Sequence, residues 1–266
     1  TTASGSNPHI ANPQLGYTYS FGLSGGWLTV TIVASVANGT WSGSSGGNWS
    51  VAGNWTAVSG TMPPSSAGDT ATLGTGSSPV NLDANETVGA LNFNNAGSFA
   101  IANSGGTLTL DKSGSGAAVS VTDGTANDIQ APVSLNDTTT VTVSSGKSLS
   151  IFGNISSTSS SKTLTANGAG VVALSGNNTY GPSAGTVGTT LSGGGTLQLG
   201  GSSPLGSGDL SITASGNIQA GTGGATVGNT ITLGTSTTVT VDTAGNSLAL
   251  NGIISGSGGA LTKVGN

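Results

Sequence analysis

Residues 140–151 read TVTVSSGKSLSI, and this stretch contains the pattern that decides the fold. Before a short Ser-Ser-Gly-Lys turn, Val alternates with Thr, and after it, Leu and Ile alternate with Ser. Such a period of two is typical of strands with one buried face. The same alternation recurs at residues 107–110, 119–122, 196–199, 210–213, 230–233, 239–241 and 247–250. We therefore predict an all-β protein.

Composition then favours one all-β architecture over another. An antiparallel sandwich core, about 10 Å thick, usually needs some large side chains, yet Phe152 and Tyr180 are the only aromatic residues after position 99. Stacked coils can fill a thinner interior with small aliphatic residues and place Asn, Ser and Thr ladders at their corners. Gly contributes 48 of the 266 residues, which suits many tight corners. We predict a β-solenoid rather than a sandwich.

Charge and cysteine content exclude several classes of function. The net charge is −5 and the chain has no Arg, so we expect no nucleic-acid or anionic-lipid partner. The absence of Cys excludes a disulfide scaffold, a thiolate zinc site and a Cys nucleophile. No apolar run reaches the roughly 20 residues that a membrane helix needs. The best apolar stretch, residues 27–37, is predicted to be a β-strand. We expect no membrane insertion and no cofactor.

The N-terminal region differs from the rest of the chain. Seven of the aromatic residues lie in the first 55 positions, and residues 1–14 read as an extended arm. Alternating apolar residues on either side of Gly25-Gly26 predict two strands. We assign residues 1–40 to an N-terminal arm with capping or donor strands and residues 41–266 to the solenoid.

Residues 164–208 contain three short motifs in a fixed order: Leu174-Ser175-Gly176, Asn178-Thr179-Tyr180 and Gly195-Thr196-Leu197. This segment resembles the autotransporter-associated β-strand repeat of bacterial surface proteins, and a second copy begins at Leu261. Residues 41–93 look like the N-terminal coils of large repeat proteins of that group. The resemblance implies a right-handed parallel β-helix that is secreted or displayed on a bacterial surface.

Candidate catalytic and metal-binding residues are sparse. A polysaccharide-degrading β-helix needs two carboxyl groups about 5 to 9 Å apart, and the nine acids are scattered along the chain. We interpret the pair Asp83 and Glu86 as a solvated turn, and Asp123 with Asp128 as a turn or a Ca²⁺ contact. The only His, His9, lies in the arm. We predict no catalytic residue and no metal site, and we expect that the protein is not an enzyme.

Trp41, Trp49 and Trp55 admit two interpretations. Their rings can fill the open end of the solenoid, where the first coil would otherwise expose its interior. They can also form a stacking platform for sugar rings, which would make the protein a carbohydrate-binding adhesin.

Our main hypothesis is a structural extracellular β-solenoid of a bacterial surface fibre or adhesive layer. The alternatives are the adhesin, with glycans as partners, and the polysaccharide-degrading enzyme. For assembly, we expect self-association into a homopolymer: the N-terminal strands of one copy add head to tail to the open C-terminal edge of the next. The residues expected to make this contact are Tyr17, Tyr19, Phe21, Trp27, Leu28, Val30, Ile32, Leu261 and Val264. The competing interpretation is that the N-terminal strands fold back and cap their own first coil.

Overall fold

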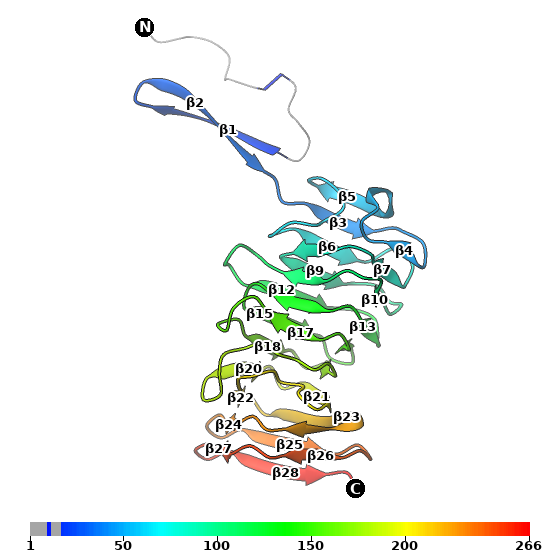
Figure 1. Ribbon diagram of the computed structural model, residues 1–266, viewed down its shortest axis with the longest axis vertical. Helices are drawn as coiled ribbons and strands as arrows, with labels where there is room; N and C mark the ends of the chain where they lie inside the picture. The colour runs from blue at the N-terminus through cyan, green and yellow to red at the C-terminus, as the bar shows by residue number, and fades with distance from the viewer. Residues whose placement is uncertain (1–9, 12–16) are drawn as a thin grey trace.

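Short strands connected by tight corners stack into a parallel β-solenoid in the computed structural model (Figure 1). The structure describes residues 10, 11 and 17–266, so most of the predicted arm, including His9, lies outside the described residues. Within the described part there is no α-helix, and one 3₁₀ turn, η1 (Ala52–Asn54), interrupts the strands. The predicted all-β solenoid is confirmed.

Three sheets form the sides of the coil. The first is 11-stranded and contains β3 (Asn38–Trp41), β6 (Thr70–Leu73), β9 (Ala90–Phe93), β12 (Ala117–Val121), β15 (Thr139–Val143), β18 (Leu164–Asn167), β20 (Val187–Leu191), β22 (Asp209–Ile212), β24 (Ile231–Leu233) and β27 (Ile254–Ser255), with β5 (Trp55–Ser59) antiparallel on β3. The second, also 11-stranded, contains β4 (Gly47–Asn48), β7 (Val80–Leu82), β10 (Ala100–Asn103), β13 (Asn127–Ile129), β16 (Ser148–Ile151), β19 (Val171–Leu174), β21 (Thr196–Gly201), β23 (Gly216–Val227), β25 (Thr238–Asp242) and β28 (Ala260–Val264), with β26 (Leu248–Leu250) on β23. The third is 4-stranded: β8 (Glu86–Val88), β11 (Leu108–Leu110), β14 (Val133–Leu135) and β17 (Ile155–Ser157).

The core consists of columns in which one inward residue of each coil lies on the equivalent residue of the next. In the first sheet the paired positions run Leu91, Val119, Val141, Ala166 and Leu191, and all five are buried. Because inward and outward residues alternate along each strand, the register that stacks these aliphatics also stacks the Thr and Ser side chains outside. The period-two pattern of residues 140–151 therefore positions both surfaces of the sheet.

Buried asparagines join adjacent coils at the corners. The side-chain oxygen of Asn178 accepts the Ile155 N–H at 2.7 Å, and its amide donates to the Pro204 carbonyl at 2.7 Å. Asn127 similarly accepts the Phe99 N–H at 2.9 Å. These contacts satisfy backbone groups that the sheets leave unpaired where the chain turns, which is the role expected for an Asn ladder.

The N-terminal strands form a separate two-stranded antiparallel sheet, β1 (Tyr17–Ser24) and β2 (Trp27–Ala34), which projects from the end of the solenoid (Figure 1). The predicted turn is present, with positive φ at Gly25 and Gly26. The expectation that this hairpin caps the first coil is wrong, because its strands pair only with each other and β5 pairs along β3 instead. The boundary drawn at residue 40 also falls inside β3, which already belongs to the solenoid.

Candidate assembly surfaces at the two ends

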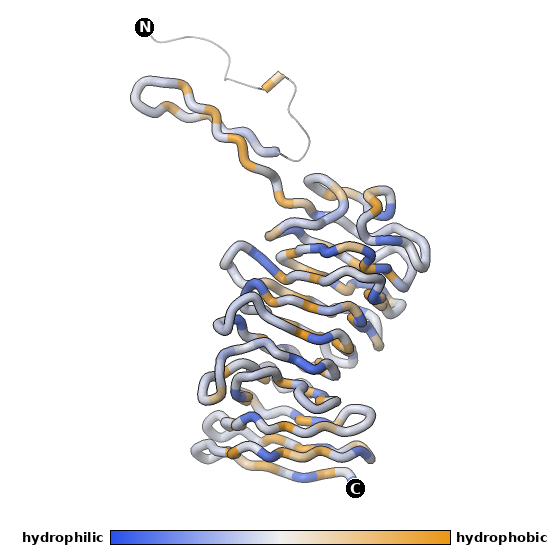
Figure 2. The backbone as a smooth tube through the Cα atoms, viewed as in Figure 1, coloured by the Kyte–Doolittle hydropathy of each residue, from blue (hydrophilic) through white to orange (hydrophobic). Residues whose placement is uncertain are grey.

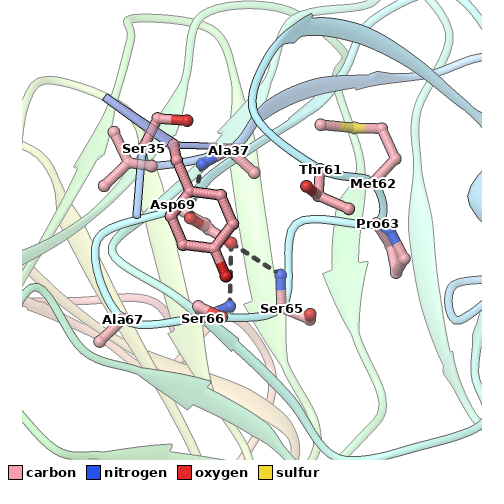
Figure 3. Close-up of a pocket in the computed structure, with 11 residues that line it drawn as sticks. Ser35, Ala37, Thr61, Met62, Pro63, Ser65, Ser66, Ala67 and Asp69 are labelled. Carbon is pink, nitrogen blue, oxygen red and sulfur yellow. Dashed lines mark hydrogen bonds between the residues drawn. The ribbon is translucent and has the colours of Figure 1, made fainter. Parts of the chain in front are cut away.

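A carboxylate fixes the point where the hairpin leaves the solenoid. Asp69 accepts the Ala37 N–H at 2.7 Å through one oxygen, and the Ser65 and Ser66 N–H groups at 3.0 and 2.9 Å through the other. Beside it lies a pocket of about 340 Å³ whose lining includes Tyr17, Met62 and Asp69 (Figure 3). The chain that connects β2 to β3 is therefore anchored at Ala37, although the hairpin beyond it extends into solvent.

One face of the hairpin is apolar. The antiparallel register places Tyr19 opposite Ile32, Phe21 opposite Val30 and Leu23 opposite Leu28, and directly opposed residues share a face. The other face carries mainly hydroxyl side chains, such as Ser20 opposite Thr31, with Trp27 near the turn and Val33 near the base. We call the face formed by Tyr17, Tyr19, Phe21, Leu23, Leu28, Val30 and Ile32 the apolar hairpin face.

Much of this face is exposed, although Tyr19 and Phe21 are half-buried. Leu23, Leu28 and Ile32 are 81%, 58% and 58% exposed, values far from those of a core. Figure 2 shows apolar stretches along the hairpin well outside the stacked coils. Residues 1–68 contain no Asp, Glu, Lys or Arg, so no charged side chain interrupts the face. Exposed contiguous apolar surface of this kind marks an interaction site.

β27 and β28 form the coil farthest from the hairpin (Figure 1). β27 and β28 pair on one side with β24 and β25, and Ile254, Leu261 and Val264 are each about 40% exposed. Lys263 stands two positions from Leu261 and therefore on the same side of β28. The predicted assembly residues Leu261 and Val264 thus lie at the end opposite the hairpin (Figure 1).

The three tryptophans pack together and do not form a platform: Trp41 ends β3, and Trp55 begins β5, which pairs antiparallel with β3. Trp41 and Trp49 are fully buried, and the rings of Trp41 and Trp49 each meet Trp55 edge to face at 5.2 and 4.7 Å. The indole N–H of Trp49 donates to the Pro64 carbonyl at 3.0 Å, and that of Trp55 donates to the Trp49 carbonyl at 2.8 Å. The expectation of a sugar-stacking surface at these residues is corrected, because none of the rings presents a face to solvent. They cap the first coil.

Most carboxylates hold turns together. Asp123 pairs with Lys147 at 2.7 Å, Asp137 accepts the Lys112 and Gly114 N–H groups at 2.7 and 2.9 Å, and Asp128 accepts from Gln130. Asp123 and Asp128 therefore interact with different side chains, Lys147 and Gln130. Across residues 17–266, no group of three or more His, Cys, Asp or Glu is arranged to hold a metal ion.

Glu86 is the exception among the acids. The interpretation of Asp83 and Glu86 as a solvated turn is wrong for Glu86, which points inward from β8 and is 4% exposed. It heads the interior column that continues through Leu108, Val133 and Ile155. Burial, together with the nearby Asp83 carboxylate, raises the pKa of Glu86 from 4.5 to about 7. Ser50 holds Asp83 through a backbone N–H at 3.1 Å and a hydroxyl at 2.5 Å.

A carboxyl group whose pKa is raised by folding destabilises the protein at neutral and higher pH. The folded chain keeps the Glu86 proton between pH 4.5 and 7 while the unfolded chain releases it. Stability contributed by protonated Glu86 is therefore full below pH 4.5 and is lost as the pH rises through about 7. We expect this group to cost on the order of 2 kcal/mol of unfolding free energy at pH 8 relative to pH 4.5.

The variant Glu86→Gln tests this expectation. Urea unfolding from pH 4.5 to 8.5 should give a flatter stability profile for the variant than for the parent chain, and the variant should be the more stable protein at pH 8. Asp83→Asn, which removes a solvent-facing neighbour, should recover only part of that gain. Parallel profiles for the parent and Glu86→Gln would contradict the assignment.

Sequence reasoning missed two features that the tertiary structure reveals. Asp69 looked like an isolated acid, and only the fold brings Ala37 from 32 positions earlier to its carboxylate. The pattern Glu86-Thr87-Val88 was a usable signal for Glu86, because Val88 reads as an inward residue and a period of two places Glu86 on the same side.

No family model, curated protein or solved structure matches this chain. In the part of the chain that the structure describes, no helix has the length and apolar character needed to cross a membrane.

Proposed function

We propose that this protein is a structural extracellular β-solenoid of a bacterial surface fibre or adhesive layer, and that it self-associates through its ends. The observation that carries the proposal is the exposed apolar hairpin, which projects from one end of the stacked coils and pairs with none of them (Figure 1). Apolar surface at this end favours contacts there over contacts between rod sides.

The outward-facing residues of the first sheet support the same proposal. Outward positions in register along the first sheet are Thr140, Thr165, Thr190 and Ser211, a column of hydroxyl side chains. Within the described residues two ion pairs occur, Lys147 with Asp123 and Lys162 with Asp137. A column of hydroxyl side chains offers little apolar surface for contacts between the sides of two rods. Membership of residues 164–208 in the autotransporter-associated β-strand repeat, and with it the bacterial surface location, forms part of the proposal.

Catalysis is not part of the proposed role. Asp83 and Glu86 have pKa values that differ in direction, the first lowered and the second raised, as in an acid and base pair. However, the lining of the pocket near the hairpin and that of a second pocket near Gly223 include neither residue. We infer a structural role for both carboxyl groups.

Deleting residues 1–34 tests the self-association. The hairpin pairs only with itself, and Ala37 with its bond to Asp69 is retained, so the shortened chain should unfold at the same urea concentration as the parent. Sedimentation velocity and negative-stain electron microscopy should show concentration-dependent end-to-end oligomers for the parent and monomers for the shortened chain. A parent chain that remains monomeric, or oligomers that persist after deletion, would contradict the proposal.

The surface location has its own test. Immunogold labelling of intact cells of the source bacterium should decorate the cell exterior. Labelling that requires permeabilisation would refute the extracellular role without affecting self-association.

A further inference from the structure

The outer edge of β2 is available for strand pairing. Among the described residues, β1 is the only strand that pairs with β2. Successive residues of a strand direct their N–H and C=O groups alternately to its two sides, so about half of the backbone groups of β2 face away from β1. From Trp27 to Val33 every side chain of β2 is exposed, on both faces of the hairpin. This edge can therefore accept another strand.

The outer edge of β2 also lacks the features that protect sheet edges elsewhere in the described part of the chain. Natural sheets protect their edges with short strands, bulges or charged side chains. Here β4 and β27 have two residues each, β5 pairs with β3 through a register shift at Asn38, and β28 carries Lys263. By contrast, the eight residues of β2, WLTVTIVA, pair in continuous register and include no charge and no Pro. Such a strand is prone to pair with another chain.

A second copy of β2 fits this edge on both faces. When two antiparallel strands are related by a two-fold axis perpendicular to their sheet, each face of one strand continues as the same face of the other. Leu28, Val30 and Ile32 then meet the same apolar residues of the second copy, and Thr29 and Thr31 meet the same hydroxyl side chains. Cross-strand pairs of these kinds stabilise antiparallel sheets. Neither copy of β2 carries a charge that would repel the other.

The geometry of antiparallel pairing restricts the register of this contact. Residues whose backbone groups face outward must oppose each other, and they occur at every second position. The two-fold axis therefore passes through a pair of identical residues and not between two different ones. An axis at Val30 or at Thr31 gives the longest overlap of the two strands. In either case Thr31 lies opposite a threonine of the second copy, Thr29 or Thr31.

We propose that β2 pairs along its outer edge with β2 of a second copy, which gives a four-stranded antiparallel sheet in the order β1-β2-β2-β1. The solenoid follows the C-terminal end of β2 (Figure 1), so antiparallel pairing places the two solenoids at opposite ends of this sheet. Four strands are also more stable in water than an isolated pair. The inference rests on the proposed self-association and specifies its contact as hairpin to hairpin, in place of head-to-tail addition.

Charges placed near the axis test this contact. Thr31 and Ser20 oppose each other on one face of the hairpin, but only Thr31 belongs to the strand that meets its copy. In Thr31→Lys two ammonium groups approach each other, so sedimentation equilibrium should show dimerisation weakened by about tenfold. In Ser20→Lys the two charges lie about 14 Å apart, beyond the screening length of physiological salt, and the change should be less than about twofold.

Mixing charges separates repulsion from damage to the hairpin. Thr31→Lys and Thr31→Asp chains should each dimerise poorly alone, and an equimolar mixture should dimerise at least as tightly as the parent, because opposite charges then meet across the axis. Urea unfolding of the solenoid should be unchanged in every variant, since the hairpin strands pair only with each other.

The absence of Cys allows a direct measurement of the register. Opposed residues in an antiparallel pair have Cα atoms about 4.5 to 5.5 Å apart, a separation that suits a disulfide. Under mild oxidation, either Val30→Cys or Thr31→Cys, whichever lies on the axis, should form a cross-linked dimer. Ser20→Cys should not, because three strand spacings separate its two copies.

The outcomes distinguish this contact from self-association in general. Equal weakening by Thr31→Lys and Ser20→Lys, no recovery in the mixture, or a cross-link at Ser20→Cys alone would overturn pairing through β2. If deletion of residues 1–34 abolishes oligomers that these substitutions leave unchanged, the β2 contact is wrong and the proposed self-association stands. A parent chain that remains monomeric contradicts both.

Discussion

Replacing Trp49 with alanine is expected to lower the free energy of unfolding by about 4 kcal/mol, because the change removes a fully buried aromatic ring and leaves a cavity. The ring packs on Trp55 at 4.7 Å, and its N–H satisfies the Pro64 carbonyl. Loss of this cap exposes the first coil, and an uncovered terminal coil of a stacked sheet invites aggregation. Urea denaturation followed by circular dichroism measures the effect.

Trp27→Ala is the matched control. The same side chain is removed from a position that is 79% exposed, so the solenoid should unfold at an unchanged urea concentration. A loss at Trp27 comparable to that at Trp49 would show that the hairpin, and not the buried tryptophan cluster, protects the end of the stack. Both proteins should be compared at low concentration, so that self-association does not contribute.

Gly153→Ala is expected to destabilise the protein by about 3 kcal/mol or more, since overpacking of this kind forces the backbone to move. A β-carbon at Gly153 would lie 1.9 Å from the Ala131 carbonyl oxygen of the preceding coil. No rotamer relieves this contact, because the position of a β-carbon is set by the backbone. Gly106 and Gly252 meet the preceding coil just as closely, with 2.0 Å to the carbonyl oxygens of Ala84 and Asn229.

Gly228→Ala provides the comparison. A β-carbon there meets nothing within 4 Å, and the residue does not require a positive φ. Alanine should therefore leave stability unchanged or raise it slightly by restricting the unfolded chain. Equal losses at Gly153 and Gly228 would show that the close approach of adjacent coils at the corner is not what requires glycine.

The candidate surfaces were only partly predictable. Alternation around Gly25-Gly26 predicted both hairpin strands and the apolar residues on them, because turn and strand preferences are local. Whether this pair would cover the first coil depended on competition with β5 and the tryptophans, which the pattern does not describe. The Trp41, Trp49 and Trp55 spacing fitted a cap and a sugar platform equally well, since ring burial is set by what folds over the rings.

The sequence by itself determined the all-β class, the positions of the strands and the choice of stacked coils over a sandwich. These follow from a period of two, from turn residues and from the shortage of aromatic side chains, all of which are properties of short segments or of composition. Only the tertiary structure decided the register that stacks Val141 on Val119, the coils that bury Glu86 and raise its pKa, and the exposure of the hairpin. Each of these depends on contacts between residues more than twenty positions apart, and no local pattern specifies which distant segment will lie alongside.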